Sequence, residues 1–460
     1  MAGMADVAPI RFEKDAENIV TVTFDAPGAA VNTMTEAWDA AFAQTVERLQ
    51  DEIRRSKSSV RGVILASGKK TFFAGAELKD LLKYSLNDGP KVFRWLESVK
   101  KRMRALETLG IPVVAALEGT ALGGGWEIAL CAHCRIALDD ASIQLGLPEV
   151  TLGLLPGTGG VTKTVRILGL QAAFAYLVEG KTMRPQEAAK LGLVQGLAAN
   201  REDLFKMARE WIRANPSPRQ PWDEEKYRMP GGSPGGPAIS QMLSIAPAML
   251  VEKTRGLYPA PKAIMAAMVE GAYVDFDTAL RIESRYLARL AVGGVAKNLI
   301  SLFFNRTAIK SGASRPKDVP KWQAAKVGIL GAGMMGGGIA YANAVRGVPS
   351  VLKDVSVEAA EKGRGYTEKV LSRRKKPAAK ELALIKPTAD YKDLQGCDLI
   401  IEAVFEKRDL KAQVTKEAEP MLAAGGFFAS NTSTLPISGL AKASAKPENF
   451  IGLHFFSPVD

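Results

Sequence analysis

Ala121-Leu-Gly-Gly-Gly-Trp-Glu127 and Leu147-Pro-Glu149 each place a carboxylate in a glycine-bearing, apolar stretch of this 460-residue chain. More glycine follows in Leu154-Leu-Pro-Gly-Thr-Gly-Gly160, and the upstream loop Phe72-Phe-Ala-Gly-Ala76 has the same character. A carboxylate is costly to bury unless it is paired or has a chemical use. We therefore interpret the two glutamates as a pair that can hold one water between them.

Strands, glycine loops and helices alternate around these stretches. Ile19–Phe24 predicts a strand, and apolar residues at helical spacing between 38 and 53 predict the helix that follows it. Residues 60–65 and 111–117 predict two more strands, and the second leads through glycines into a helix that begins near Glu127. This alternation is typical of an α/β domain whose functional loops lie at strand ends.

A second constellation begins at Val327-Gly-Ile-Leu-Gly331-Ala-Gly333-Met-Met-Gly336, a short apolar strand that runs into a glycine triplet. Gly331 allows the tight turn, Gly333 lets the backbone approach a pyrophosphate, and Gly336 allows close packing of helix on strand. Asp354 ends a further predicted strand, about 20 residues after the first glycine, where an acid binds a ribose 2′-hydroxyl. The stretch predicts a dinucleotide site that favours NAD over NADP.

Three later segments add candidate residues to this half. Residues 397–404 predict a buried strand, and we count Glu402 in it among the cofactor-binding residues. Residues 426–430 predict another strand, followed by hydroxyl and amide side chains that include Ser433. His454, one of only two histidines, follows a short apolar stretch. A histidine there is either a packed core residue or a base that takes a hydroxyl proton during hydride transfer.

Composition shifts divide the chain into three segments. Residues 216–237 contain six prolines and four glycines, which predicts an irregular surface crossing. Helical sequence resumes near Ile239 and includes 279–304, and a polar stretch at 310–321 predicts a boundary. We expect a core over 1–215, a crossing with a helical linker over 216–321, and a nucleotide-binding domain over 322–460.

Charge and cysteine content limit the partners and the compartment. The formal net charge of +12, from 61 basic and 49 acidic residues, favours anionic partners such as phosphate-bearing small molecules. The positive charge is dispersed, which argues against nucleic acid. Three cysteines indicate a reducing compartment, and the Cys131-Ala-His133-Cys134 cluster predicts packing and no metal site. With no signal layout over 1–12 and no membrane span in 111–132, we expect a cytoplasmic protein.

With these motifs in hand, two resemblances follow. Residues from about 10 to 200 resemble the crotonase (enoyl-CoA hydratase) family, because the four glycine motifs occur in that family's order. Residues from about 323 to 460 resemble the NAD-binding domain of 3-hydroxyacyl-CoA dehydrogenase through the glycine triplet, Ser430-Asn-Thr-Ser433 and His454-Phe-Phe-Ser-Pro458. A chain that contains both regions, in this order, resembles the multifunctional fatty-acid oxidation α-subunits. The implied fold is α/β: a crotonase-like ββα superhelix, a helical linker, and a Rossmann-type doubly wound domain.

The resemblance also implies roles for the candidate residues. Backbone N–H groups of Ala76 and Gly124 would form an oxyanion hole for a coenzyme A thioester, and one such donor typically contributes about 3–4 kcal/mol. Glu127 and Glu149 would add water to a 2-enoyl thioester in fatty-acid β-oxidation, one protonated because two nearby carboxylates repel. His454 would be the dehydrogenase base. Ser433 would steady the substrate oxygen, Asp354 would hold the ribose of NAD, and a thiolase partner and an oligomer are suggested.

The chain departs from these families in two places. The family's histidine is oriented by a glutamate about a dozen residues later, followed by a helical domain, whereas this sequence stops at Asp460. We expect a fragment that hydrates enoyl-CoA and oxidises 3-hydroxyacyl-CoA poorly or not at all. The family's Thr-Gln-Arg is replaced by Val-Thr-Lys163, which we expect to alter coenzyme A contacts.

Three other interpretations remain open. A Δ3–Δ2 enoyl-CoA isomerase needs the same oxyanion hole but can act with one carboxylate, so two glutamates favour hydration. A non-catalytic scaffold would bind acyl-CoA and NAD without turnover. The third interpretation is structural: Glu127 would be a helix-start acid and Glu149 a turn acid.

Overall fold

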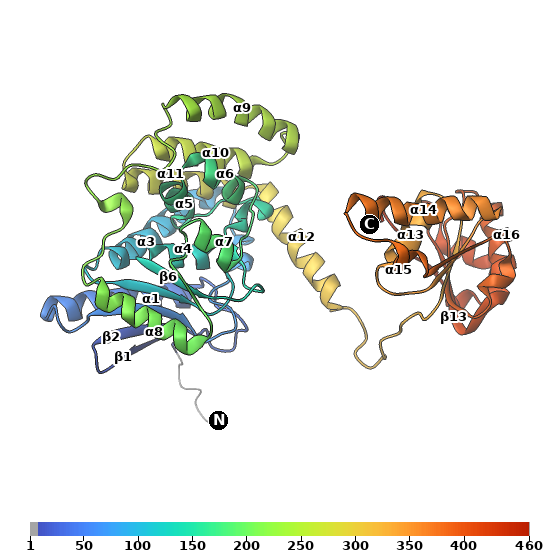
Figure 1. Cartoon of the computed structure of the whole chain (residues 1–460), viewed down its shortest axis with the longest axis horizontal. Coiled ribbons are helices and arrows are strands. Elements are labelled where there is room, and N and C mark those ends of the chain that lie inside the picture. Colours follow the sequence, from blue (N-terminus) through green and yellow to red (C-terminus); the bar gives the residue numbers. More distant parts are fainter. Residues whose placement is uncertain (1–7, 460) are drawn as a thin grey trace. The chain divides into compact units, whose positions relative to one another are not determined.

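The computed structural model describes residues 8–459, which form two units, Met1–Arg315 and Pro316–Asp460 (Figure 1). Residues 1–7, in the stretch where no signal layout is expected, lie outside the described residues. Residues 216–315 belong to the first unit, because their helices pack on it.

The first unit contains a six-stranded sheet in the order β1-β2-β3-β4-β6-β8. Only β1 and β2 are antiparallel, and β3 and β4 are buried along their whole length, as strands of a covered parallel sheet are. The strands are β1 (Ile10–Lys14), β2 (Ile19–Phe24), β3 (Gly62–Ser67), β4 (Val113–Leu117), β6 (Cys134–Leu138) and β8 (Gly196–Ala198). The predicted strand at Ile19–Phe24 is confirmed. The strands predicted at 60–65 and 111–117 are also present, as β3 and β4, and each begins two residues later than expected.

A separate pair of two-residue strands positions the glutamate loops. β5 (Ala121–Leu122) pairs in parallel with β7 (Leu145–Gly146), and Gly123 N–H donates to the Gly146 carbonyl at 2.9 Å. Because β5 leads directly to Glu127 and β7 leads to Glu149, this pairing brings the two loops side by side.

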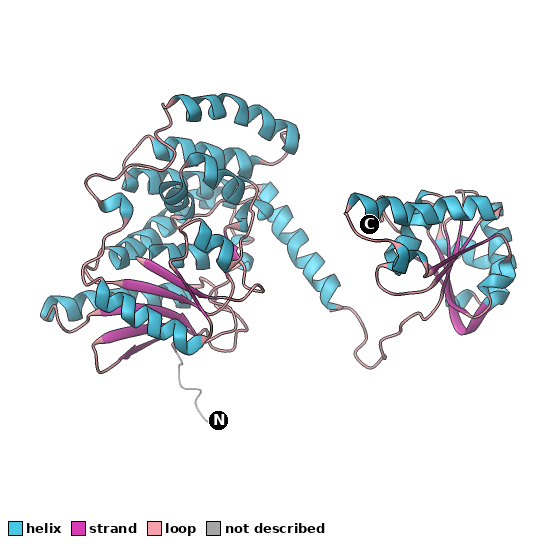
Figure 2. Ribbon diagram, in the orientation of Figure 1, coloured by secondary structure: helices cyan, strands magenta, loops and turns pink. Residues whose placement is uncertain are grey.

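Helices cover the sheet and build the rest of the first unit (Figure 2). They are α1 (Glu36–Arg55), α2 (Leu78–Leu81), α3 (Gly89–Glu107), α4 (Gly124–Cys131), α5 (Gly160–Leu168), α6 (Leu170–Val178), α7 (Pro185–Lys190), α8 (Arg201–Ala214), α9 (Pro237–Thr254), α10 (Pro259–Ala272), α11 (Phe276–Ala291) and α12 (Gly294–Ser311). α10 packs on α5 and α6, and α11 packs on α3 and α5. α1 follows the predicted apolar spacing, and Thr35 caps its first turn by accepting from the N–H of Trp38.

One expectation for the later part of this unit needs correction. The crossing at 216–237 is mostly irregular but contains one turn of 3₁₀ helix, Pro221–Asp223. The expected helical sequence at 279–304 forms two helices, α11 and α12, which are bent by 70° where Gly293 and Gly294 interrupt the apolar pattern. Within residues 8–459, no single helix has the length and apolarity of a membrane span. The bent pair of α11 and α12 reaches that length and apolarity only when the two helices are counted together.

The second unit is a six-stranded parallel sheet in the order β11-β10-β9-β12-β13-β14. Its elements are β9 (Val327–Leu330), α13 (Met334–Ala344), β10 (Ser350–Lys353), α14 (Val357–Arg373), α15 (Ala379–Leu382), β11 (Ile385–Thr388), β12 (Cys397–Glu402), α16 (Arg408–Ala418), β13 (Leu422–Ser430), α17 (Ile437–Leu440) and β14 (Phe450–Gly452). In chain order the strands read 3-2-1-4-5-6, the Rossmann arrangement, whose ligand crevice opens where the order reverses, between β9 and β12.

Two apolar clusters pack this sheet from opposite faces. Ile329 of β9 shares one with Ile339 of α13, and Ile400 of β12 shares the other with Val414 of α16. Figure 2 shows helices on both sides of the strands, as the doubly wound prediction requires. Loops at the carboxyl ends of the strands are therefore free to carry the site.

Candidate active site

One cavity of about 510 Å³ in the first unit is lined by all four residues that the sequence predicts for hydration. Ala76, Gly124, Glu127 and Glu149 all line this cavity. The two carboxyl groups thus face a common space, although α4 carries the first and the 3₁₀ helix η2 (Pro148–Leu152) carries the second.

Glu127 is fixed by three hydrogen bonds from one turn. Its Oε1 accepts from the N–H of Thr158 and of Gly160, both at 2.7 Å, and its Oε2 accepts from the Thr158 hydroxyl at 2.7 Å. The side chain is buried. A Cβ at position 160 would lie 2.8 Å from Oε1, so glycine is needed for this approach. Donors of this kind stabilise an ionised carboxylate.

Glu149 is held differently, because its Oε2 is buried and accepts no hydrogen bond within the described part of the chain. Its Oε1 lies where a Cβ on Gly123 would approach to 2.7 Å, and Gly123 has a φ of +55°. Only glycine suits both the backbone conformation and the space at 123. An unpaired buried carboxyl oxygen favours the protonated form.

The surroundings raise the pKa of both glutamates above the ordinary value for this side chain. Burial raises the pKa of Glu149 well above that range, and the charge of Glu127 raises it further. Burial also raises the pKa of Glu127, with the charge of Glu283 adding to the effect, while the hydrogen bonds from Thr158 and Gly160 act in the opposite direction. The pair therefore favours one proton, held by Glu149.

The loops of Ala76 and Gly124 lie against each other. A Cβ on Gly75, which has a φ of +98°, would meet the amide nitrogen of Gly124 at 3.4 Å. Gly124 is the first residue of α4, where N–H groups have no acceptor within the helix and the dipole is positive. Met34 N–H donates to the Gly75 carbonyl at 2.9 Å and anchors the first loop. Two backbone amides at one wall of the cavity can stabilise a developing oxyanion.

Most of the other residues that line the cavity are apolar, although Thr33, Glu77 and Thr151 are among them. α11 contributes Leu287 and Ala291, and α12 contributes Phe303 and Phe304, so helices beyond the first sheet close this end. An extended hydrocarbon chain fits such a lining, since its apolar surface leaves water on binding.

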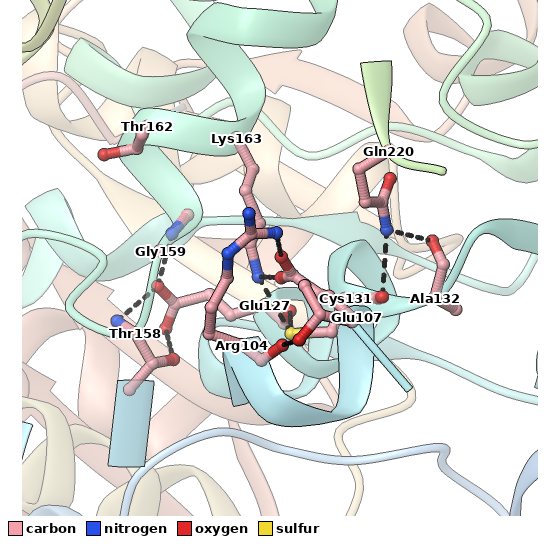
Figure 3. A network of polar contacts seen from close by, with 12 residues as sticks. Arg104, Glu107, Glu127, Cys131, Ala132, Thr158, Gly159, Thr162, Lys163 and Gln220 are labelled. Atoms are coloured by element: carbon pink, nitrogen blue, oxygen red, sulfur yellow. Dashed lines mark hydrogen bonds and ion pairs between the residues drawn. The ribbon is translucent and has the colours of Figure 1, made fainter. Parts of the chain in front are cut away.

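Lys163, in the replaced segment that we expect to alter coenzyme A contacts, is not among the residues that line the cavity. Its side chain is 2% exposed, and its Nζ forms an ion pair with Glu107 and lies 2.8 Å from Cys131 Sγ (Figure 3). Arg104 binds the other oxygen of Glu107 at 3.0 Å. Residues 160–165 of α5 are all buried, so Lys163 lies inside the protein.

The Cys131–Cys134 cluster lies in the core, as the sequence predicts. Both thiols are free and buried, and burial raises the pKa of each to about 12. His133 Nδ1 accepts from Val113 N–H at 3.1 Å, and burial lowers the pKa of its ring to about 4.

Sequence reasoning missed Glu283 of α11, which is fully buried beside the turn that holds Glu127. It accepts from Gly159 N–H at 2.7 Å and from Thr162 N–H at 3.0 Å. No local motif marks a single glutamate in an amphipathic helix, so only the three-dimensional arrangement identifies it.

In the second unit, the glycine triplet has the geometry of a dinucleotide site. Gly331 has a φ of +90°, and a Cβ on Gly336 would lie 1.7 Å from the Gly331 carbonyl oxygen, so helix and strand are in close contact. A Cβ on Gly333 would meet nothing within 4 Å, which leaves the approach to α13 open. Asp354 Oδ2 accepts from Ala332 N–H at 2.6 Å and so lies on the glycine turn. These residues fit a nicotinamide dinucleotide.

Glu402 does not face the crevice directly, which corrects its assignment as a cofactor contact. It is fully buried, Lys411 Nζ lies 2.9 Å from both of its oxygens, and the Ser430 hydroxyl also donates to it. Lys411 in turn binds Glu406 at 3.1 Å. Because both carboxylate oxygens of Glu402 are bonded, this buried acid orders the neighbouring strand ends. Its partner, Lys411, comes from the next helix, α16.

Ser433 and His454 meet at the carboxyl edge of this sheet. Ser433 Oγ lies 3.1 Å from His454 Nε2, and both residues are accessible. Glu406 accepts from Ser433 N–H at 3.1 Å, and Asn431 Oδ1 accepts from Phe455 N–H at 2.7 Å, so both backbones are anchored. This excludes the alternative that His454 is a packed core residue.

Comparisons with known proteins agree with this division. Residues 14–219 match the enoyl-CoA hydratase/isomerase family, and residues 326–460 match the NAD-binding domain of 3-hydroxyacyl-CoA dehydrogenase. Fatty acid oxidation complex subunit alpha of Shewanella sp. (strain MR-4) is 36% identical over 96% of this chain and 62% of its own length. The subunit from Shewanella baltica (strain OS185) is also 36% identical, over 96% of this chain and 63% of its own.

Over nearly its whole length, the chain is similar to alpha subunits of the fatty acid oxidation complex. It combines a crotonase-fold hydratase/isomerase domain with a Rossmann-type NAD-binding domain. It spans about 62% of the length of the curated relatives that it matches. Among solved structures, (S)-3-hydroxybutyryl-CoA dehydrogenase PaaH1 from Ralstonia eutropha is 40% identical over 30% of this chain and 51% of its own, with a TM-score of 0.29.

Proposed function

We propose that the first unit adds water to 2-trans-enoyl-CoA and forms 3-hydroxyacyl-CoA, a step of fatty-acid β-oxidation. The observation that carries this proposal is one cavity lined by all four residues, Ala76, Gly124, Glu127 and Glu149. The thioester carbonyl accepts from the two amides, and the apolar end of the cavity holds the acyl chain. Charge that develops on the carbonyl oxygen is stabilised by these preorganised donors.

The two glutamates differ in role because their surroundings differ. Glu127, held by three donors, is the ionised partner and accepts a proton from water as the hydroxyl oxygen bonds to the β-carbon. Glu149, with an unpaired buried oxygen, carries the proton and gives it to the α-carbon as the enolate collapses. The carbon–carbon double bond is lost and one water is consumed. Proton exchange through the next water restores the starting state.

For the second unit we propose NAD binding and a part in the oxidation of the 3-hydroxyl group to a ketone. NAD supplies the hydride acceptor when bound. Gly331, Gly333 and the start of α13 would bind its pyrophosphate, and Asp354 retains lone pairs for a ribose hydroxyl. His454, at 3.1 Å from Ser433, would take the hydroxyl proton, and Ser433 would hold the substrate oxygen.

A thiolase subunit that consumes the ketoacyl product, assembly into an oligomer, and a cytoplasmic location complete the proposal. The homologous relatives are named as subunits of a complex, which supports a partner that acts on the product. Three buried, unpaired thiols agree with a reducing compartment. Copurification with thiolase from cell extracts, followed by size determination of the assembly, tests this part.

Product analysis tests the hydratase proposal against its rivals. Incubation with a 2-enoyl-CoA should give an ester heavier by one water, identified by mass spectrometry, and this product should be absent with Glu127→Gln or Glu149→Gln. An isomerase would convert a 3-enoyl-CoA into a 2-enoyl-CoA of the same mass and would tolerate one of the two variants. A scaffold would bind the ester and leave its mass unchanged.

A further inference from the structure

The turn Thr158–Thr162, which holds Glu127, is shared between two carboxylates. Amides of Thr158 and Gly160 donate to Glu127, whereas those of Gly159 and Thr162 donate to Glu283. The Thr162 hydroxyl adds a further hydrogen bond to Glu283 at 3.1 Å. Along the start of α5, the amides therefore donate by turns to one carboxylate and to the other, and the two acids bind opposite sides of the turn. Since a helix start has several free N–H groups, it can satisfy both.

Glu283 reaches this turn from α11, and residues 276–291 lie beyond the segment 14–219 that matches the enoyl-CoA hydratase/isomerase family. Its charge is compensated inside the protein by Lys100 of α3, whose Nζ lies 3.3 Å from Glu283 Oε1. Lys100 is held by the Ser284 hydroxyl at 2.8 Å and by the Leu280 carbonyl. Both charged side chains are almost fully buried, so neither is screened by solvent.

We propose that Glu283 is a positioning residue for hydration: it fixes the Thr158–Thr162 turn, and through that turn the carboxylate of Glu127. The inference rests on the proposed hydratase function. Glu283 is absent from the cavity lining, so we assign it no contact with the substrate. A shift of about 1 Å at a reacting group can lower the rate about 100-fold. The hydratase site is thus completed by α11.

A second, electrostatic effect follows from the same arrangement. The charge of Glu283 raises the pKa of Glu127, so its removal should lower that pKa, and removal of the compensating Lys100 should raise it. These opposite directions separate a charge effect from simple damage to the fold. The ionisable groups that bind the turn or are linked to it through contacts and charge are listed here by element: Glu97, Lys100 and Glu107 on α3, Glu127 and Cys131 on α4, Glu149 on η2, Lys163 on α5 and Glu283 on α11.

The experiment compares Glu283→Gln, Lys100→Gln and the control Asp277→Asn in the full chain, with a 2-enoyl-CoA as substrate. Asp277 is on the same helix, but its side chain is 79% exposed. For E283Q we expect kcat about 10–100-fold lower with KM unchanged, and an acid limb of kcat/KM moved to lower pH. K100Q should move that limb to higher pH. D277N should match the wild type in all three quantities.

Hydrogen exchange of the amides in residues 158–163 gives a readout that does not depend on turnover. It should be faster in E283Q than in the wild type and unchanged in D277N. Should E283Q fail to fold, Thr162→Val serves instead, because it removes only the hydroxyl hydrogen bond to Glu283. An active wild type with unchanged kcat, pH limb and exchange in E283Q would overturn the inference. An inactive wild type would overturn the proposed function, and exchange alone would then decide the positioning role.

Discussion

Glu127 and Glu149 face one cavity, yet three hydrogen bonds hold the first and one oxygen of the second has no partner. Identical side chains in one site thus differ in their preferred protonation state, because donors favour the carboxylate and burial favours the acid. This asymmetry underlies the assignment of base and acid.

The pH dependence of hydration should reflect this asymmetry. Activity needs Glu127 ionised and Glu149 protonated, and the pKa of each is raised, that of Glu149 well above its ordinary range. We expect a bell-shaped profile of kcat/KM whose acid limb lies above the pH at which an ordinary glutamate titrates, and whose alkaline limb marks loss of the Glu149 proton. Initial rates across pH measure it. Full activity below that range would contradict the assignment.

Glu149→Gln should abolish hydration but stabilise the fold. A carboxyl whose pKa is raised on folding contributes stability that is complete at low pH and is lost as pH rises through the folded-state value. A neutral amide avoids this loss. The melting temperature of E149Q should therefore exceed that of the wild type at neutral pH, and the difference should shrink towards pH 4. A variant that melts lower at every pH would argue that Glu149 is paired in the fold.

Two glycine variants of the dinucleotide turn should separate binding from folding. Gly333→Ala places a methyl group in open space at an allowed φ of −68°, so the second unit should remain folded while NAD binding weakens at least tenfold. Gly336→Ala places it 1.7 Å from the Gly331 carbonyl oxygen and should destabilise the unit itself. Calorimetric titration with NAD and thermal unfolding distinguish them. Equal NAD affinity in G333A and the wild type would contradict the site.

Lys163→Met tests whether this lysine acts inside the core. Its removal leaves Glu107 buried with Arg104 as the remaining cation, and breaking a buried ion pair typically costs about 3–5 kcal/mol. We expect a clearly lower melting temperature, with the KM for the coenzyme A ester unchanged in the protein that remains folded. A raised KM at an unchanged melting temperature would instead indicate that Lys163 contacts coenzyme A directly.

Local sequence carries much of the fold and of both sites. The strand at Ile19–Phe24, the glycine turn that ends at Gly336 and the contact of Ser433 with His454 all depend on patterns within short segments. A strand followed by a glycine turn has few other uses, so such motifs are specific. Side chains at the carboxyl ends of parallel strands also meet at one edge of a sheet.

What sequence reasoning misjudged depends on contacts between distant elements. Glu283 binds amides more than a hundred residues earlier in the chain, and no periodicity links a helix position to that turn. Glu402 resembles a site acid at a strand end until Lys411 of the following helix is seen to engage it. The replacement that contains Lys163 was expected to alter coenzyme A contacts, whereas the Lys163 Nζ is bound inside the core. In each case a buried partner decides the role of a charged group.

The most direct test of the central claim is the ultraviolet absorbance of crotonyl-CoA mixed with the full chain. Hydration removes the conjugated enoyl group, so we expect the absorbance to fall with catalytic turnover, and to stay constant with Glu127→Gln although that variant still binds the ester. Constant absorbance with the wild type, or an equal fall with E127Q, would contradict the account.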